Sequence, residues 1–237
     1  MIDKYKQEIK KYLCKRWSVP YNRYGIPNPL FERLTEGGSL TLIDIGAHNG
    51  YFSESISKYC DITKGIIIEP LPEKYAILKN KFKPPHYEVV DYIISDKNGV
   101  VDFEVNELTE TSSILHIKSD IPEHANLNLK VTGKMARQSK TLDSLVRELS
   151  LEKIDLLKID VQGAELLVLI GSNHVLSRTR MIWIEVSFKP LYDNSATFFD
   201  IYSYLNDRNF RLIGMNPVFH GPDGELLQCD ALFMRRY

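Results

Sequence analysis

Acidic and small residues gather where several apolar runs of this 237-residue sequence end. The first run ends in DIGAHNG (44–50), whose glycines Gly46 and Gly50 allow a tight turn and a close approach of the backbone to a ligand. The second run ends at Glu69 and Pro70, and Glu69 follows Gly46 by 23 residues. A carboxylate at this spacing can accept hydrogen bonds from both hydroxyl groups of a ribose. These residues predict a site for a cofactor that contains a nucleoside.

The surrounding sequence narrows the choice of cofactor. The GxGxxG pattern of dinucleotide sites and the GxxxxGK[ST] phosphate loop are both missing, which disfavours a nucleotide-dependent oxidoreductase. Strand ends rich in carboxylates suit a cationic ligand better than a pyrophosphate. S-adenosylmethionine fits this pattern, since it offers a ribose to Glu69, a sulfonium cation, and an amino-acid tail to the glycine turn.

Two later apolar runs end in residues suited to proton transfer, one in Asp160-Val161-Gln162-Gly163 and the other at Glu185. A carboxylate such as Asp160 could accept a hydroxyl proton, an effect worth about 10²–10⁴ in rate; His48 and Glu185 are the other candidate bases. Lys158 precedes Asp160 by two residues, so both point to one side of a strand, and a lysine there is expected to reach a carboxylate.

Two other roles remain open for these acids. Asp160 and Gln162 could simply cap the helix that follows them. Asp160, Glu165 and Glu185 could coordinate a hard cation such as Mg²⁺, although no compact spacing of ligands supports a metal site.

Apolar runs that alternate with helical segments predict an α/β fold. The expected helices cover 50–59, 72–82, 141–149, 164–171 and 195–207. The expected strands cover 40–46, 65–70, 87–95, 153–160, 180–188, 210–215 and 226–236, with 100–105 as the hairpin partner of 87–95 and 106–138 as a long loop with a short strand or two. Right-handed crossovers then give a doubly wound, mostly parallel seven-stranded sheet with one antiparallel strand near its edge. Ligands bind such sheets beyond the carboxyl ends of the strands, where the acids lie.

The order of these motifs resembles that of the FkbM-type family of S-adenosylmethionine-dependent methyltransferases. The matching segments are DIGAHNG (44–50), EP (69–70), SDKNG (95–99), TLDSL (141–145), LLKIDVQGAELLVLIG (156–171) and IEVSFKPLY (184–192). The resemblance covers about residues 40–215; KIDVQGAE is its most specific part, whereas DIGAxxG is shared with many methyltransferases. The chain departs from the family at His48, where the family more often has asparagine.

The resemblance implies a Rossmann-like class I methyltransferase domain and a role for each matching residue. It implies that the cofactor is held by Asp44, Gly46, Ala47 and Gly50 at its methionine part, by Glu69 and Pro70 at its ribose, by Ser95 and Asp96 near its adenine, and by Asp160 and Gln162 near its methyl group. It also implies transfer of a methyl group to a hydroxyl of a sugar, glycan or glycolipid. An RNA or other small-molecule methyltransferase, or an inactive binding module with this fold, are the alternatives.

Charge and cysteine usage limit the remaining possibilities. The chain has 30 basic and 31 acidic residues, so it offers no strong signal for nucleic acid. Its three cysteines form no CxxC pair and no run approaches the length of a membrane helix, so a cytoplasmic protein is expected. Residues 1–36 are basic and begin with an amphipathic pattern, which predicts an N-terminal helical extension or substrate lid before a methyltransferase domain over 37–237. A homodimer remains possible.

Overall fold

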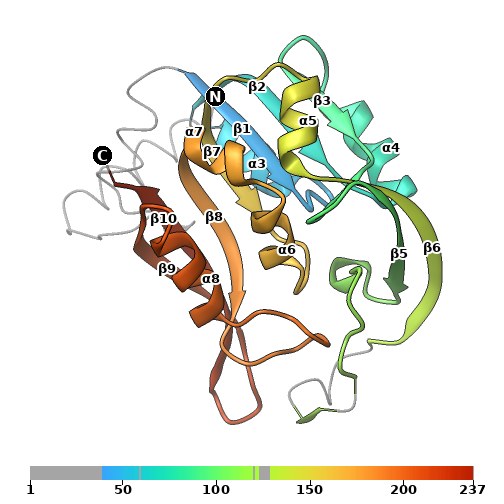
Figure 1. Ribbon diagram of the computed structural model, residues 1–237. Helices are drawn as coiled ribbons and strands as arrows, with labels where there is room; N and C mark the ends of the chain where they lie inside the picture. The colour runs from blue at the N-terminus through green and yellow to red at the C-terminus, as the bar shows by residue number, and fades with distance from the viewer. Residues whose placement is uncertain (1–38, 59, 120, 123–128, 237) are drawn as a thin grey trace, which may run out of the picture.

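The computed structural model describes residues 39–58, 60–119, 121–122 and 129–236 (Figure 1). The extension predicted over 1–36, and its boundary with the domain, lie outside these residues. A seven-stranded sheet has the order β3-β2-β1-β7-β8-β10-β9. Its strands are β1 (Ser39–Ile45), β2 (Asp61–Ile68), β3 (Tyr87–Val90), β7 (Ile154–Ile159), β8 (Thr179–Ser187), β9 (Phe210–His220) and β10 (Leu226–Arg235).

Strand pairing confirms the mostly parallel, doubly wound sheet. β1 pairs in parallel with β2 on one side and with β7 on the other, so the chain changes direction across the sheet between these two central strands. In this sheet β10 alone runs opposite to the other six strands, and it therefore pairs antiparallel with both β8 and β9. Because ligands bind where the strand order reverses, the carboxyl ends of β1 and β7 are the expected place for a site.

Helices cover both faces of the sheet because its inner strands are apolar on both sides. Along β1, Ile43 and Ile45 pack on one face while Leu40 and Leu42 pack on the other. In Figure 1 the four helices from α5 to α8 lie on the near side of the sheet. The helices are α3 (Tyr51–Ser57), α4 (Pro72–Lys81), α5 (Leu142–Glu148), α6 (Glu165–Ile170), α7 (Asn173–Arg178) and α8 (Phe198–Asn206). None of the helices described has the length and the apolar run that a membrane span requires.

Two expectations about residues 87–138 are wrong. The strand expected over 87–95 is two strands, β3 and β4 (Ile93–Ile94), and β4 belongs to a second sheet of order β4-β6-β5. There β5 (Gly99–Asn106) pairs antiparallel with β6 (Val131–Lys140) and not with 87–95 as a hairpin. The long loop expected over 106–138, with a short strand or two, contains the 3₁₀ turn η1 (Thr109–Thr111) and most of β6. Polar residues on the exposed side of β6 conceal its strand pattern.

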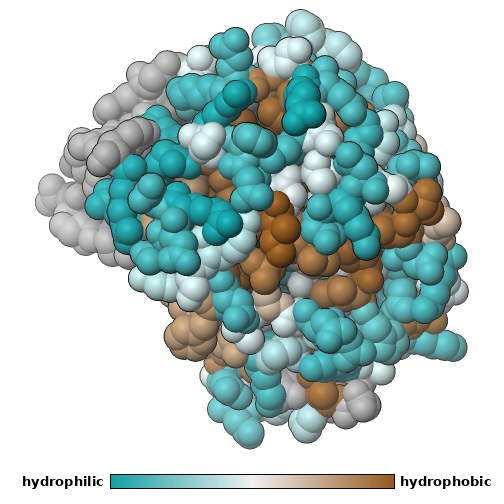
Figure 2. Space-filling model, in the orientation of Figure 1, coloured by the Kyte–Doolittle hydropathy of each residue, from teal (hydrophilic) through white to brown (hydrophobic). Residues whose placement is uncertain are grey.

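The second sheet lies beside the carboxyl end of the large sheet (Figure 1). Figure 2 shows apolar residues at the surface in the middle of this face, over α6 and toward β5 and β6, bordered by hydrophilic residues.

Candidate active site

A cavity of about 460 Å³ lies at the carboxyl ends of the central strands. Eight of the predicted site residues line it: Gly46, Ala47, His48, Glu69, Pro70, Asp160, Gln162 and Glu185. Four do not line it: Asp44, Gly50, Ser95 and Asp96. Ser95 is buried and its hydroxyl donates to exposed Asp96, and the adenine contact that the resemblance implies for this pair stays a prediction.

Close packing of the β1 and β7 ends explains the first glycine of the turn. Gly46 has a φ of +74°, and a Cβ atom there would lie 1.8 Å from the backbone oxygen of Asp160. Gly50 also has a positive φ, of +73°, and faces Leu78 and Phe82 of the α4 segment. Gly46 therefore contributes to the cavity wall, while Gly50 serves the packing behind it.

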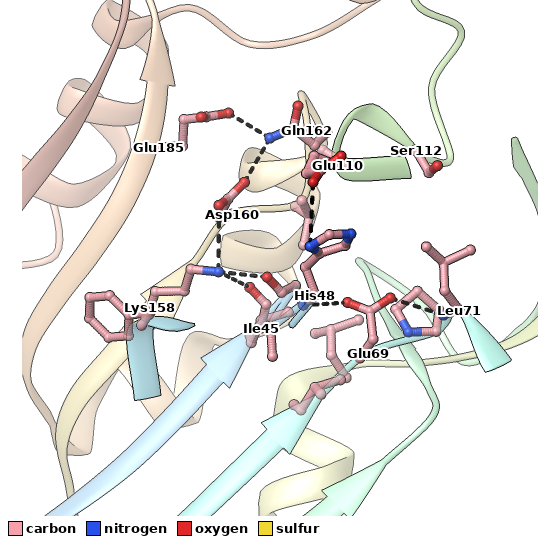
Figure 3. A pocket seen from close by; sticks show the side chains of 18 of the residues that line it. Ile45, His48, Glu69, Leu71, Glu110, Ser112, Lys158, Asp160, Gln162 and Glu185 are labelled. Atoms are coloured by element: carbon pink, nitrogen blue, oxygen red, sulfur yellow. Dashed lines mark hydrogen bonds and ion pairs between the residues drawn. The ribbon is translucent and has the colours of Figure 1, made fainter. Parts of the chain in front are cut away.

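Glu69 is held by backbone groups at the end of β2 (Figure 3). Its Oε2 accepts a hydrogen bond from the His48 N–H at 2.7 Å, and its Oε1 accepts one from the Leu71 N–H at 2.9 Å. Burial raises the pKa of Glu69, against the effect of these two hydrogen bonds. Two carboxylate oxygens with further lone pairs are thus fixed at the cavity wall. Beside them the wall is largely apolar, formed by Pro70, Leu71, Tyr92, Ile93, Phe103 and Ile114.

Lys158 joins the two aspartates of the central strands, as the sequence predicts. Its Nζ lies 3.2 Å from Asp44 Oδ1 and 3.5 Å from Asp160 Oδ2, and it donates to the Gly46 carbonyl at 2.6 Å. Burial alone would lower the pKa of Lys158, but the charges of Asp44 and Asp160 outweigh it and raise the pKa. Asp44 is fully buried and also accepts from the Ser53 hydroxyl at 2.6 Å. It therefore acts on the cavity through Lys158.

Gln162 connects the two acids that line the inner part of the cavity (Figure 3). Its Nε2 donates to Asp160 Oδ1 at 2.8 Å and to Glu185 Oε2 at 3.0 Å. The Tyr192 hydroxyl donates to Gln162 Oε1 at 2.9 Å. Burial, followed by the charges of Asp160 and Glu165, raises the pKa of Glu185 well above its usual value. Tyr192 has no role in the sequence prediction; its place in the matching segment IEVSFKPLY was the available signal.

Asp230 of β10 is a second residue that the sequence reasoning missed. It pairs in register with Glu185 on one side and with Asn216 on the other, and all three line the cavity. Burial and the charge of Asp160 raise the pKa of Asp230 to about 6, against the opposing effect of the Asn216 and Trp183 side chains. An aspartate inside the apolar run 226–236 was the signal that could have identified it.

His48 lies at the mouth of the cavity, close to η1. Its ring Nε2 is 3.1 Å from the Thr109 hydroxyl, and its Nδ1 is 3.9 Å from Glu110. Burial and the charge of Lys74 lower the pKa of His48, which favours the neutral ring at neutral pH. A neutral imidazole can accept a proton, so His48 is compatible with either a basic or a positioning role.

The carboxylates are not arranged as the Mg²⁺ site considered from the sequence. Glu165 Oε1 accepts hydrogen bonds from the N–H groups of Val161 and Gly163, at 3.0 and 3.1 Å, and is committed to the turn. Within the described ranges, no group of three or more histidine, cysteine or acidic side chains is placed to hold a metal ion.

A mostly parallel seven-stranded sheet with β10 antiparallel, and an acid-lined cavity at its switch point, define the Rossmann-like fold of class I methyltransferases. Comparison with known proteins gives the particular family. The model of the methyltransferase FkbM domain matches residues 44–212, and the chain belongs to this family.

Individual relatives agree with this assignment. The chain is 28% identical over 202 residues to the 2-O-methyltransferase NoeI of Sinorhizobium fredii, a match that covers 82% of this chain and 81% of NoeI. It is 29% identical over 178 residues to the AMB antimetabolite synthetase AmbE of Pseudomonas aeruginosa, covering 62% of this chain and 8% of AmbE. The crystal structure of an FkbM methyltransferase from Methylobacillus flagellatus superposes with a TM-score of 0.54 at 15% identity; the match covers 83% of this chain and 44% of the other.

Proposed function

We propose that the protein is an S-adenosylmethionine-dependent O-methyltransferase that methylates a hydroxyl group of a sugar or glycan. The observation that carries this proposal is the placement of Glu69 and Asp160 in one cavity, on either side of the β1 glycine turn. β2 and β7 are separated only by β1, so the ends of these two strands are about 10 Å apart, which is two strand spacings. A nucleoside held by Glu69 can therefore direct its 5′ substituent toward Asp160.

The residues present fit this cofactor. Glu69 offers carboxylate oxygens to the two ribose hydroxyls, and the apolar wall beside it, which includes Leu71, Ile93 and Phe103, suits the adenine ring. The backbone of Gly46 and Ala47 lines the part of the cavity nearest β1, where the amino-acid tail is expected. When bound there, S-adenosylmethionine supplies an electrophilic methyl group.

Residues of β7 and β8 would then act on the acceptor. Asp160 accepts the proton of the acceptor hydroxyl while the oxygen forms its bond to the methyl carbon, and Lys158 and Gln162 hold the carboxylate in place. Holding the oxygen in line with the breaking C–S bond contributes up to about 7–11 kcal/mol. Glu185 and His48 are the other candidate bases because each lines the same cavity.

Transfer of the methyl group to oxygen is supported by NoeI, whose name states 2-O-methylation and which aligns over most of both chains. The sugar acceptor rests on the resemblance of the motifs to the FkbM-type family. Two measurements distinguish the alternatives. An RNA acceptor would bind with a steep dependence on salt, and an inactive module would not bind S-adenosylmethionine in a calorimetric titration.

The test is incubation of the full chain with S-adenosylmethionine labelled in its methyl group and a panel of mono- and oligosaccharides, with total RNA in a parallel reaction. We expect label in a saccharide, in an ether linkage that resists mild base. Label in RNA alone, or cofactor binding without any transfer, would contradict the proposal.

A further inference from the structure

The inner part of the cavity carries more negative than positive groups. Asp160, Glu185 and Asp230 line it from β7, β8 and β10. Lys158 is the one lysine or arginine among the described residues that line the cavity, and it already contacts Asp44 and the Gly46 carbonyl. The charges around the cavity therefore favour binding of a cationic ligand over a neutral one.

Strand register brings two of these acids directly opposite each other. Asp230 pairs with Glu185 across β10 and β8, an arrangement that costs free energy when both carboxylates are charged. On its other side Asp230 pairs in register with Asn216 of β9, which also lines the cavity. Packing gives no reason for such a pair, whereas a bound cation would relieve its repulsion.

We propose that Asp230 makes this cavity discriminate by charge between S-adenosylmethionine and its product S-adenosylhomocysteine, strengthening binding of the cationic cofactor and easing release of the neutral product. This inference rests on the proposed function. The two ligands share their adenosine and amino-acid parts and differ in the methyl group and the sulfonium charge, so contacts with Glu69 and the glycine turn cancel in the comparison. Asp230 lies beyond residues 44–212, the region that matches the family model.

The effect should depend on pH. Lys158 and Asp160 on β7, Glu165 at the start of α6, Glu185 on β8 and the Tyr192 hydroxyl are the titratable groups around this part of the cavity. Burial, reinforced by the negative charge of Asp160, raises the pKa of Asp230 to about 6. Raising the pH through this value adds negative charge to the cavity, which favours the sulfonium ligand and leaves the neutral product unaffected.

Calorimetric titration with each ligand, at about pH 5.5 and about pH 7.5, tests the proposal with the full chain. In the wild type, we expect the ratio of the product Kd to the cofactor Kd to rise at least about fivefold between these pH values. Asp230→Asn keeps the size of the side chain and one of its oxygens, and it removes the charge. In this variant, the ratio of the product Kd to the cofactor Kd at about pH 7.5 should be at least about fivefold lower than in the wild type, and it should lose most of its pH dependence. Asp223→Asn, on an exposed turn, should match the wild type.

The outcomes separate this proposal from the one on which it rests. If both ligands bind and the wild-type ratio is flat with pH, the charge discrimination is wrong while the cofactor site stands. If neither ligand binds to the folded chain, the cofactor site and this inference both fail. Should Asp230→Asn not fold, Asp230→Ser takes its place, and a ratio that still rises with pH in this variant as in the wild type overturns the proposal.

Discussion

Lys158 gives two aspartates different roles in the same cavity wall. The side chain of Asp44 is fully buried and bonded to Ser53, so it can reach no substrate. The side chain of Asp160 is 34% exposed and faces the cavity, while its other contacts are Lys158 and Gln162. One ammonium group thus ties an inner, structural carboxylate to an outer one that is free to meet an acceptor.

Replacing the outer carboxylate should separate binding from chemistry. In Asp160→Asn, Lys158 keeps its contacts with Asp44 and the Gly46 carbonyl, so we expect a folded protein that binds S-adenosylmethionine within about tenfold of the wild type. Turnover should fall at least about 10²-fold because an amide cannot accept the proton. Calorimetry and the labelled-methyl assay measure the two effects. Asp223→Asn, on an exposed turn outside the cavity, is the control, and wild-type turnover in Asp160→Asn would show that Asp160 has only a structural role.

The ends of the strands β1 and β7 are in contact at Gly46, and this contact leaves no room for a side chain at this position. Gly46→Ala places a Cβ atom 1.8 Å from the Asp160 backbone oxygen, in addition to the strain of its positive φ. Gly224 has a similar φ of +78° and nothing within 4 Å of an added Cβ, so Gly224→Ala isolates the strain. We expect Gly224→Ala to cost about 1 kcal/mol of unfolding free energy and Gly46→Ala at least about 2 kcal/mol more. Equal urea midpoints for the two variants would show that the strands separate easily.

The strands that surround the site could be predicted because both their faces are covered. GIIIEP (65–70) and LLKID (156–160) are mostly apolar, and an acid stands where each strand ends, so both the elements and the residues Glu69 and Asp160 follow from the sequence. The second sheet could not be predicted, since β6 alternates polar residues with few apolar ones and its partner β5 precedes it by a long segment. Asp230 could not be predicted for a related reason, because its role depends on the register between β8 and β10, which no local pattern specifies.

For the molecule as a whole, buried acids at the cavity should make stability depend on pH. Burial raises the pKa of Glu165 to about 7, above its ordinary value of 4.5, so the folded chain holds a proton there that the unfolded chain releases. The resulting stabilisation is complete below about pH 4.5 and is lost as the pH rises through about 7.

Glu165→Gln tests this linkage. The amide oxygen can still accept from the N–H groups of Val161 and Gly163, and the buried charge is gone. At about pH 7.5 we expect the variant to be more stable than the wild type by at least about 1 kcal/mol, and to lose less stability between about pH 5.5 and about pH 7.5. Urea unfolding at both pH values measures this. If the variant is less stable than the wild type at both pH values, and its stability depends on pH as in the wild type, Glu165 is needed as a carboxylate.

The central claim is that the cavity binds S-adenosylmethionine with its ribose on Glu69. Calorimetric titration with S-adenosylhomocysteine, comparing the wild type with Glu69→Ala, tests it most directly, because it requires no knowledge of the acceptor. Loss of a charge-assisted ribose contact should weaken binding by about 1.5–3 kcal/mol, or about 10- to 150-fold, with Glu73→Ala on the exposed face of α4 as a matched control. We predict binding of one ligand per chain, weakened by this amount in Glu69→Ala alone. Equal affinity in the wild type and a folded Glu69→Ala, or no binding to either, would contradict the account.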